Sequence, residues 1–170
     1  MRVLGVDPGL SRCGYGVVDG AATGGRAQAV AAGVLTTDAA ASLPRRLADL
    51  QADLRALLAD VRPDVVAVER VFFQTNVRTA MSVAQASGLA MAESVAAGCD
   101  VVEYSPNQVK EAVAGWGGAG KEEVERMVRA LLSIERPIKP ADAADAVALA
   151  LCHLAHAPRR ARLGAIEGRR

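Results

Sequence analysis

The apolar residues of the chain fall into short runs that predict five strands. Runs that end at turn residues predict strands at Val3–Val6, Cys13–Val18 and Ala29–Thr37, and their short connections favour an antiparallel meander. Asp64–Glu69 contains four consecutive apolar residues, which is typical of a strand buried on both faces of an α/β sheet. Val101–Tyr104 predicts the fifth strand.

Helical periodicity fills the segments between and after these strands. In the first helix, Leu47, Leu50, Leu54 and Leu58 recur on one face. The predicted helices are Leu43–Val61, Thr79–Ala97, Pro106–Val113, Glu122–Leu132 and Ala141–His156. This order of elements predicts an α/β fold with a mixed sheet, in a single domain over residues 1–156.

Charge and composition narrow the function classes. Residues 157–170 contain five Arg and one Glu, so they form a basic tail that we expect to be flexible. The remaining chain has 15 basic and 18 acidic residues, a net charge of −3, which by itself does not indicate a nucleic-acid-binding protein. Only five residues are aromatic, which excludes an RNA-binding module built on stacked rings.

Cysteine usage and hydropathy predict a cytoplasmic protein with no membrane segment. The three cysteines are far apart and form no C-x-x-C pair, as expected in a reducing compartment. No stretch approaches about 18 consecutive apolar residues. Cys152, His153 and His156 lie together on the last helix, but a zinc site normally needs four ligands, so ordinary helix packing is favoured.

Four acidic residues occupy positions from which they could converge. Asp7 and Glu69 each end an apolar strand, and functional groups in α/β sheets gather where strands end. Asp142 and Asp145 are three residues apart near the start of the last helix and therefore share one face. Such an oxygen-rich site suits Mg²⁺, and two such ions can promote phosphodiester hydrolysis.

Each acid also has an ordinary structural explanation. Asp7 precedes Pro-Gly and could simply form a turn, while Asp142 and Asp145 suit the N-terminal turn of a helix. Glu69 is harder to explain, because Glu is disfavoured in strands. Glu103 is a candidate fifth member that a solvated strand edge explains equally well. The combination across three elements indicates a metal-dependent phosphoryl-transfer site.

Four sequence blocks, in order, resemble the RuvC family of Holliday-junction resolvases. They are MRVLGVDPGLSRCGYGVV at 1–18, VVAVERVFFQTN at 65–76, YSPNQVKEAVAG at 104–115 and KPADAADAVALA at 139–150. The resemblance implies a ribonuclease H-like fold, with a five-stranded mixed sheet of three antiparallel strands plus two parallel ones, flanked by helices. It also implies a Mg²⁺-dependent endonuclease that nicks a four-way DNA junction symmetrically as a homodimer and works with a branch-migration helicase complex.

The resemblance carries over to individual residues. Asp7, Glu69, Asp142 and Asp145 match the family's metal-binding acids, which implies a site for two Mg²⁺ ions, with Mn²⁺ able to substitute. The residues that we expect to contact DNA are Phe72 and Phe73 as an aromatic wedge, Lys110 and Lys121 as phosphate contacts, and the neighbouring Arg70 and Asn76. The helix at 79–97, rich in Met and Ala, is the expected dimer interface.

Two other functions remain open from the residues alone. Gly5–Gly9, followed by Gly14 and Gly16, also resembles the first phosphate motif of actin-like sugar kinases, although a second such motif and a second domain are missing. A non-catalytic junction-binding scaffold is the other alternative. Gly115–Lys121 begins like an ATP-binding P-loop, but Glu122 follows where Ser or Thr is needed, so we interpret it as a loop near DNA phosphate.

Overall fold

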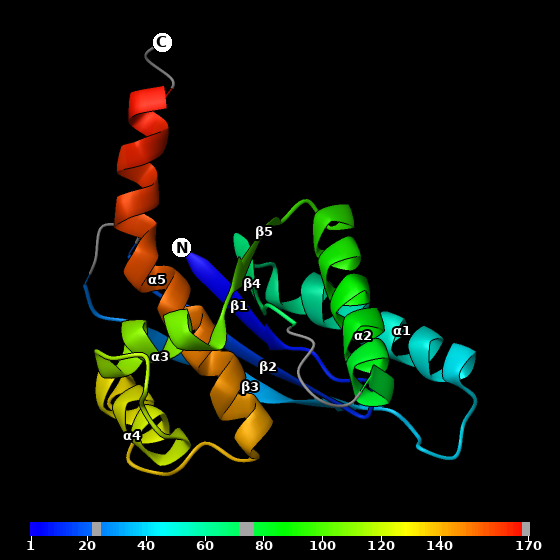
Figure 1. Ribbon diagram of the computed structural model, residues 1–170. Helices are drawn as coiled ribbons and strands as arrows, with labels where there is room; N and C mark the ends of the chain where they lie inside the picture. Colours follow the sequence, from blue (N-terminus) through cyan, green and yellow to red (C-terminus); the bar gives the residue numbers. More distant parts are fainter. Residues whose placement is uncertain (22–24, 72–76, 168–170) are drawn as a thin grey trace.

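The computed structural model contains five strands and five helices in the order that the apolar pattern predicts (Figure 1). It describes the backbone of residues 1–21, 25–71 and 77–167, and the side chains of residues 1–21, 25–71 and 80–157. The elements are β1 (Arg2–Asp7), β2 (Arg12–Asp19), β3 (Gln28–Thr36), α1 (Leu43–Val61), β4 (Val65–Glu69), α2 (Val77–Ala96), β5 (Asp100–Tyr104), α3 (Pro106–Ala114), α4 (Lys121–Leu132) and α5 (Ala141–Glu167).

The sheet is mixed, as predicted, with strand order β3-β2-β1-β4-β5. β1, β2 and β3 pair antiparallel, while β1, β4 and β5 run parallel. Val6 of β1 pairs with Val68 of β4, so the next residues, Asp7 and Glu69, end neighbouring strands at the same edge of the sheet. The topology therefore brings together two of the predicted site residues.

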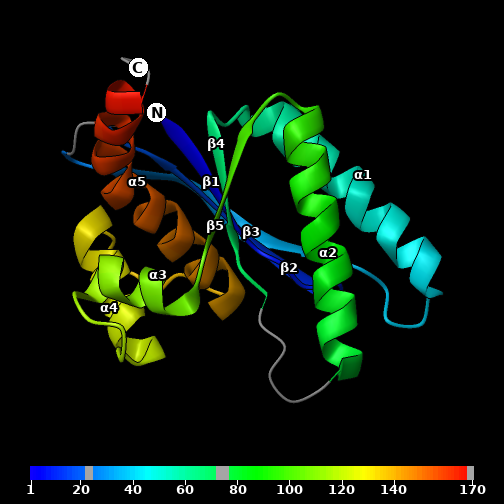
Figure 2. The same cartoon turned by 45° about the horizontal axis from the view of Figure 1, so that its top comes forward.

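Helices cover both faces of the sheet (Figures 1 and 2). α1 and α2 pack on one face, over Leu4, Val6, Val66 and Val68. α3, α4 and α5 pack on the other face, where α5 buries a nearly continuous apolar segment. The strands β1 and β4 contribute to both cores, which explains why their sequences are apolar at successive positions.

The glycines of β1 and β2 allow α5 to lie directly on the sheet backbone. A Cβ on Gly5 would overlap the carbonyl of Ala146, and a Cβ on Gly14 would overlap the carbonyl of Asp142. The first turn of α5 can therefore approach the end of β1, which is where Asp7 lies. Two glycines that resembled a kinase phosphate motif thus serve helix–sheet packing.

The boundaries of the elements agree with the predictions to within two residues, with one exception. α5 continues to Glu167, whereas the sequence predicted that the helix ends at His156 and that a flexible tail follows. Residues 157–167 contain Ala, Arg and Leu, which are strong helix formers, and this preference outweighs the helix-ending signal of Pro158. In the part of the chain that the structure describes, no helix has the length and apolar character needed to span a membrane.

Candidate active site

Asp7, Glu69 and Asp145 line one cavity of about 370 Å³ at the carboxyl ends of β1 and β4. Lys110 of α3 and Lys121 of α4 line the same cavity. Its remaining wall is apolar and is formed by Pro106, Val109, Val124, Ala148 and Leu149. Three acidic groups from three separate elements are therefore held in a partly desolvated space with two cationic side chains at its edge.

The two strand-end carboxyls lie in a strongly negative environment. Burial, together with the charges of Glu69, Asp145 and Asp142, raises the pKa of Asp7 to about 7, against a smaller opposite effect of Lys121. Burial and the charge of Asp145 also raise the pKa of Glu69, while Lys121 and a hydrogen bond with Asp7 oppose this rise. Shifts with these causes are typical of functional carboxyl groups.

The two acids of α5 each pair with a cation. Asp142 Oδ2 accepts hydrogen bonds from Arg12, with Nε at 2.7 Å and the terminal guanidinium nitrogen also at 2.7 Å. Lys121 Nζ donates to Asp145 Oδ2 at 3.1 Å, and this bond and charge raise the pKa of Lys121. Asp142 does not line the cavity, but its charge acts on Asp7. All four predicted acids thus belong to one electrostatic cluster.

The donor set fits a hard divalent cation. Every candidate ligand is a carboxylate oxygen, and the pKa of Asp7 is raised first by burial and then by the neighbouring carboxylates, whose negative charge a bound cation would offset. Among the described side chains, no three His, Cys, Asp or Glu residues are grouped tightly enough to hold a metal ion. In this arrangement Asp142 pairs with Arg12 and Asp145 pairs with Lys121, so metal binding through these two carboxylates would require them to exchange these partners.

Of the predicted DNA-contacting residues, Lys110 and Lys121 lie at the cavity. Arg70 is exposed directly after β4, and its backbone N–H donates to the carbonyl of Tyr104 at 2.8 Å, which fixes the start of this loop. Phe72, Phe73 and Asn76 lie outside the described residues. Glu103 is exposed on β5 and does not line the cavity, in agreement with its explanation as a solvated strand edge.

Arg12 is a site residue that the sequence prediction missed. It begins β2, and Gly14 two residues later pairs with Asp7 in the sheet register. The predicted antiparallel pairing of this strand with the strand of Asp7 was a signal that Arg12 lies near the acids. An isolated Arg is usually a solvated surface residue, however, so the sequence alone did not single it out. Its pairing with Asp142, 130 residues away, depends on the docking of α5.

The loop at 115–120 connects two helices and therefore differs from a P-loop. α3 ends at Gly115, which has a positive φ of 87°, and α4 begins at Lys121. A P-loop needs a strand before its glycines, whereas a helix precedes this loop, as the sequence predicted. Gly120 caps α4 without a side-chain hydrogen bond.

The Cys152 and His156 pair on α5 belongs to the packing of the helix. His156 Nδ1 lies 2.8 Å from the carbonyl oxygen of Cys152 and 3.7 Å from its sulfur. His153 is buried and shares a hydrogen bond of 3.0 Å with the hydroxyl of Tyr104. The contacts of His156 are therefore internal to α5, whereas the bond between His153 and Tyr104 joins α5 to β5.

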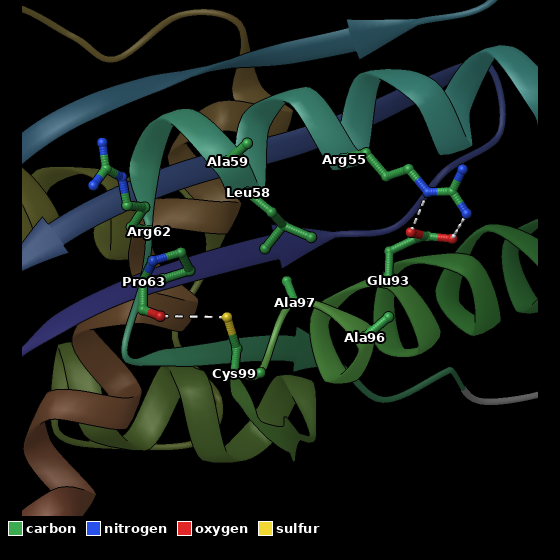
Figure 3. Close-up of a pocket in the computed structure, with 10 residues that line it drawn as sticks. Arg55, Leu58, Ala59, Arg62, Pro63, Glu93, Ala96, Ala97 and Cys99 are labelled. Carbon is green, nitrogen blue, oxygen red and sulfur yellow. Dashed lines mark hydrogen bonds and ion pairs between the residues drawn. The ribbon is translucent and has the colours of Figure 1, made fainter.

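A second cavity of about 600 Å³ lies between α1 and α2 (Figure 3). Arg55 donates to both carboxylate oxygens of Glu93, at 2.6 and 3.0 Å, and its bonds lower the pKa of Glu93. Cys99 Sγ donates to the carbonyl of Pro63 at 3.3 Å. Glu93 is the only carboxylate among the described residues that line this cavity, and Arg55 already neutralises it. This cavity therefore contains no carboxylate without a cationic partner among its described lining residues.

Comparison with known proteins identifies the family. Residues 3–153 match the family described as crossover junction endodeoxyribonuclease RuvC. This chain belongs to the RuvC family. The RuvC protein of Salinispora arenicola is 52% identical over 169 residues, which cover 99% of this chain and 96% of that relative.

Solved structures of RuvC proteins share the fold. The structure of Thermus thermophilus RuvC in complex with a Holliday junction substrate matches with a TM-score of 0.87 and 37% identity, covering 94% of this chain and 96% of that one. A structure of Thermus thermophilus RuvC matches with a TM-score of 0.85 and 37% identity, and the match covers 96% of this chain and 97% of that one. The ribonuclease H-like fold and the enzyme class, an endonuclease, are thereby confirmed, and the ATP-binding alternative is disfavoured.

Proposed function

We propose that this RuvC-family chain is a divalent-metal-dependent endonuclease that resolves four-way DNA junctions by paired symmetric nicks, in homologous recombination and repair. The observation that carries the proposal is that Asp7, Glu69 and Asp145, from β1, β4 and α5, line one cavity edged by Lys110 and Lys121, while Asp142 lies near enough for its charge to act on Asp7. The relatives named as crossover junction endodeoxyribonucleases and the Thermus thermophilus complex with a junction support this choice of substrate.

Asp7, Glu69, Asp142 and Asp145 would hold the metal, for which Mg²⁺ is the expected ion, two per site, with Mn²⁺ as a substitute. When bound, the metal supplies an activated water and stabilises the leaving oxygen of the phosphodiester. Asp7 and Glu69 are suited to this task because strand ends fix their positions before any ligand arrives. Arg12 and Lys121 meanwhile hold the carboxylates of α5 near the cavity.

Two lysines would attract the phosphates of the substrate. Lys110 and Lys121 line the cavity, and their ammonium groups would attract a phosphate whose negative charge the acids alone would repel. Lys121 has two candidate partners, Asp145 and a phosphate, so release of Asp145 to the metal would free Lys121 for DNA. Phe72 and Phe73 remain the proposed aromatic wedge, with Arg70 and Asn76 as nearby contacts.

Two symmetric nicks need two active sites, so we propose a homodimer. The outward face of α2 supports this proposal, because Met81 is 58% exposed and Val95 is 64% exposed on the same helix. Gln85, Gly88 and Ala92 lie between them, so this face is uncharged over the part from Met81 to Val95 whose side chains the structure describes. An uncharged helix face with exposed apolar side chains is well suited to pack against its own copy. A branch-migration helicase complex is the expected further partner, and the cytoplasm the expected location.

The proposed function is tested by incubating the purified protein with a synthetic four-way junction or with a linear duplex of the same sequence, with and without Mg²⁺. We expect paired nicks at symmetric positions, only on the junction and only with the metal. Equal cutting of the duplex, or binding of the junction without any metal-dependent cutting, would contradict the proposal. The second result would favour the non-catalytic scaffold.

A further inference from the structure

An exposed tryptophan stands on the loop beside the candidate site. Trp116 lies between α3 and α4, and 54% of its surface is accessible to solvent. Among the large apolar side chains that the structure describes as exposed, it is the sole aromatic one. Large aromatic rings contribute strongly to binding when they are covered, so an exposed ring beside an active site indicates a contact with a ligand.

The loop holds the ring in one position. The backbone of Gly118 lies against the indole, since a Cβ at this position would overlap the ring. The indole Nε1–H points to Glu123 Oε1 at 3.5 Å. Ala119 is fully buried in the core, and its N–H donates to the carbonyl of Trp116 at 3.4 Å. The indole is therefore oriented before binding, with part of its surface free to make a contact.

The ring is close to the acidic cavity along the chain and in space. Glu123, which contacts the indole, and Lys121, which contacts Asp145, are two residues apart in the first turn of α4, so their side chains leave the helix on different sides. The loop of the ring also returns to the start of α3, because a Cβ at Gly117 would lie 3.7 Å from the carbonyl oxygen of Asn107, the residue after Pro106 of the cavity wall. Trp116 itself does not line the cavity. A DNA strand whose phosphate lies at Lys121 would thus present a neighbouring nucleotide to the indole.

We propose that Trp116 stacks on an unpaired base of the junction next to the site of cutting. This inference rests on the proposed function. A base is favoured over a protein partner because none of the other exposed large apolar side chains that the structure describes shares this loop: Leu131 lies at the far end of α4, Met81 and Val95 on α2, Leu43 on α1 and Val30 on β3. Stacking on a base needs only one ring and a nearby cation.

The charges in the first turn of α4 also favour a base as the group that contacts the indole. Glu122 and Glu123 disfavour a phosphate at the ring, whereas a base carries no charge. Lys121, on the side of the cavity, is the group that would hold the phosphate. The two functions, stacking and phosphate binding, are thus separated along one helical turn.

Fluorescence tests this inference directly, because Trp116 is the only tryptophan of the chain. The protein is titrated with an unlabelled four-way junction in Ca²⁺, and binding is followed in parallel by anisotropy of a labelled junction. We expect tryptophan emission to fall in proportion to bound junction, and to fall less with a fully paired duplex at equal occupancy. Unchanged emission at saturation, or equal quenching by the duplex, would overturn the inference; unchanged emission would instead favour a protein partner for the ring.

Variants provide an independent measure. Trp116→Ala should weaken junction binding about 5- to 150-fold, whereas Trp116→Phe should retain most of the affinity. Leu131→Ala removes another exposed apolar side chain from the far end of α4 and should leave the affinity unchanged. Wild-type affinity of Trp116→Ala would refute the proposal. Absence of any junction binding by the wild-type protein, seen by anisotropy, would instead refute the proposed function, and this inference with it.

Discussion

Asp7→Asn should make the metal-free protein more stable while it removes one of the proposed catalytic acids. Burial and neighbouring carboxylates raise the pKa of Asp7 to about 7. In the unfolded chain the same group has a pKa of about 3.9. The folded state therefore binds a proton that the unfolded state has released, and stability falls as the pH rises from about 4 to about 7.

The pKa of Asp7 differs by about 3 pH units between the folded and the unfolded state. Above pH 7 this difference lowers the free energy of unfolding by at most about 4 kcal/mol. Structural relaxation and the entry of water reduce the cost of holding an ionised carboxylate in this site. We therefore expect Asp7→Asn to raise the free energy of unfolding by about 2–4 kcal/mol at pH 8. The gain should shrink as the pH falls towards 4, where the wild-type carboxyl is protonated in both states. The amide of Asn can still donate a hydrogen bond to Glu69.

The assay is urea unfolding of both proteins between pH 4.5 and 8 in the presence of a chelator. Asp53→Asn, an exposed change on α1, is the matched control and should show no pH-dependent difference. Added Mg²⁺ should then stabilise the wild-type protein more than Asp7→Asn, because binding to the folded state adds to its stability. A variant that is no more stable than the wild type at pH 8 without metal would refute the account of the cluster.

Two further changes test the packing of α5 and the dimer. Gly5→Ala should destabilise the protein by about 1–3 kcal/mol in thermal or urea unfolding, because the new Cβ meets the backbone of α5. Gly88→Ala is the contrasting change, because Gly88 lies inside α2 with open space around it and Ala favours a helix over Gly, so this variant should be at least as stable as the wild type. A Gly5→Ala protein as stable as the wild type would contradict this packing. Met81→Glu should shift the protein from dimer to monomer in sedimentation velocity without loss of fold, because it places a charge on the uncharged face of α2. A dimer that persists in this variant would contradict the assignment of the interface to this face.

The sequence is most informative where local pattern alone decides the structure. The apolar runs of β1 and β4 predict buried strands, and the acids that end them predict a site, because a carboxylate after consecutive apolar residues has few structural reasons to be there. The parallel pairing of these strands then brings Asp7 and Glu69 together. The α5 acids could be predicted from their three-residue spacing, which places both on one face of a helix.

Features that depend on tertiary contacts could not be predicted in this way. Arg12 pairs with Asp142 only because α5 docks on Gly5 and Gly14, and nothing in the local sequence of β2 indicates this contact. The continuation of α5 to Glu167 reflects a competition between helix propensity and one proline, which a local pattern cannot decide. The position of Trp116 likewise depends on how Ala119 anchors its loop to the core.

The central claim is that the acids of β1, β4 and α5 form one catalytic site. It is tested most directly by single-turnover cutting of a four-way junction by Asp145→Asn, with junction binding measured in the same samples and Asp53→Asn as the control. We predict that Asp145→Asn binds the junction at least as tightly as the wild type but cuts it at least about 100-fold more slowly, while the control does both normally. Cutting by Asp145→Asn at the wild-type rate would contradict the account.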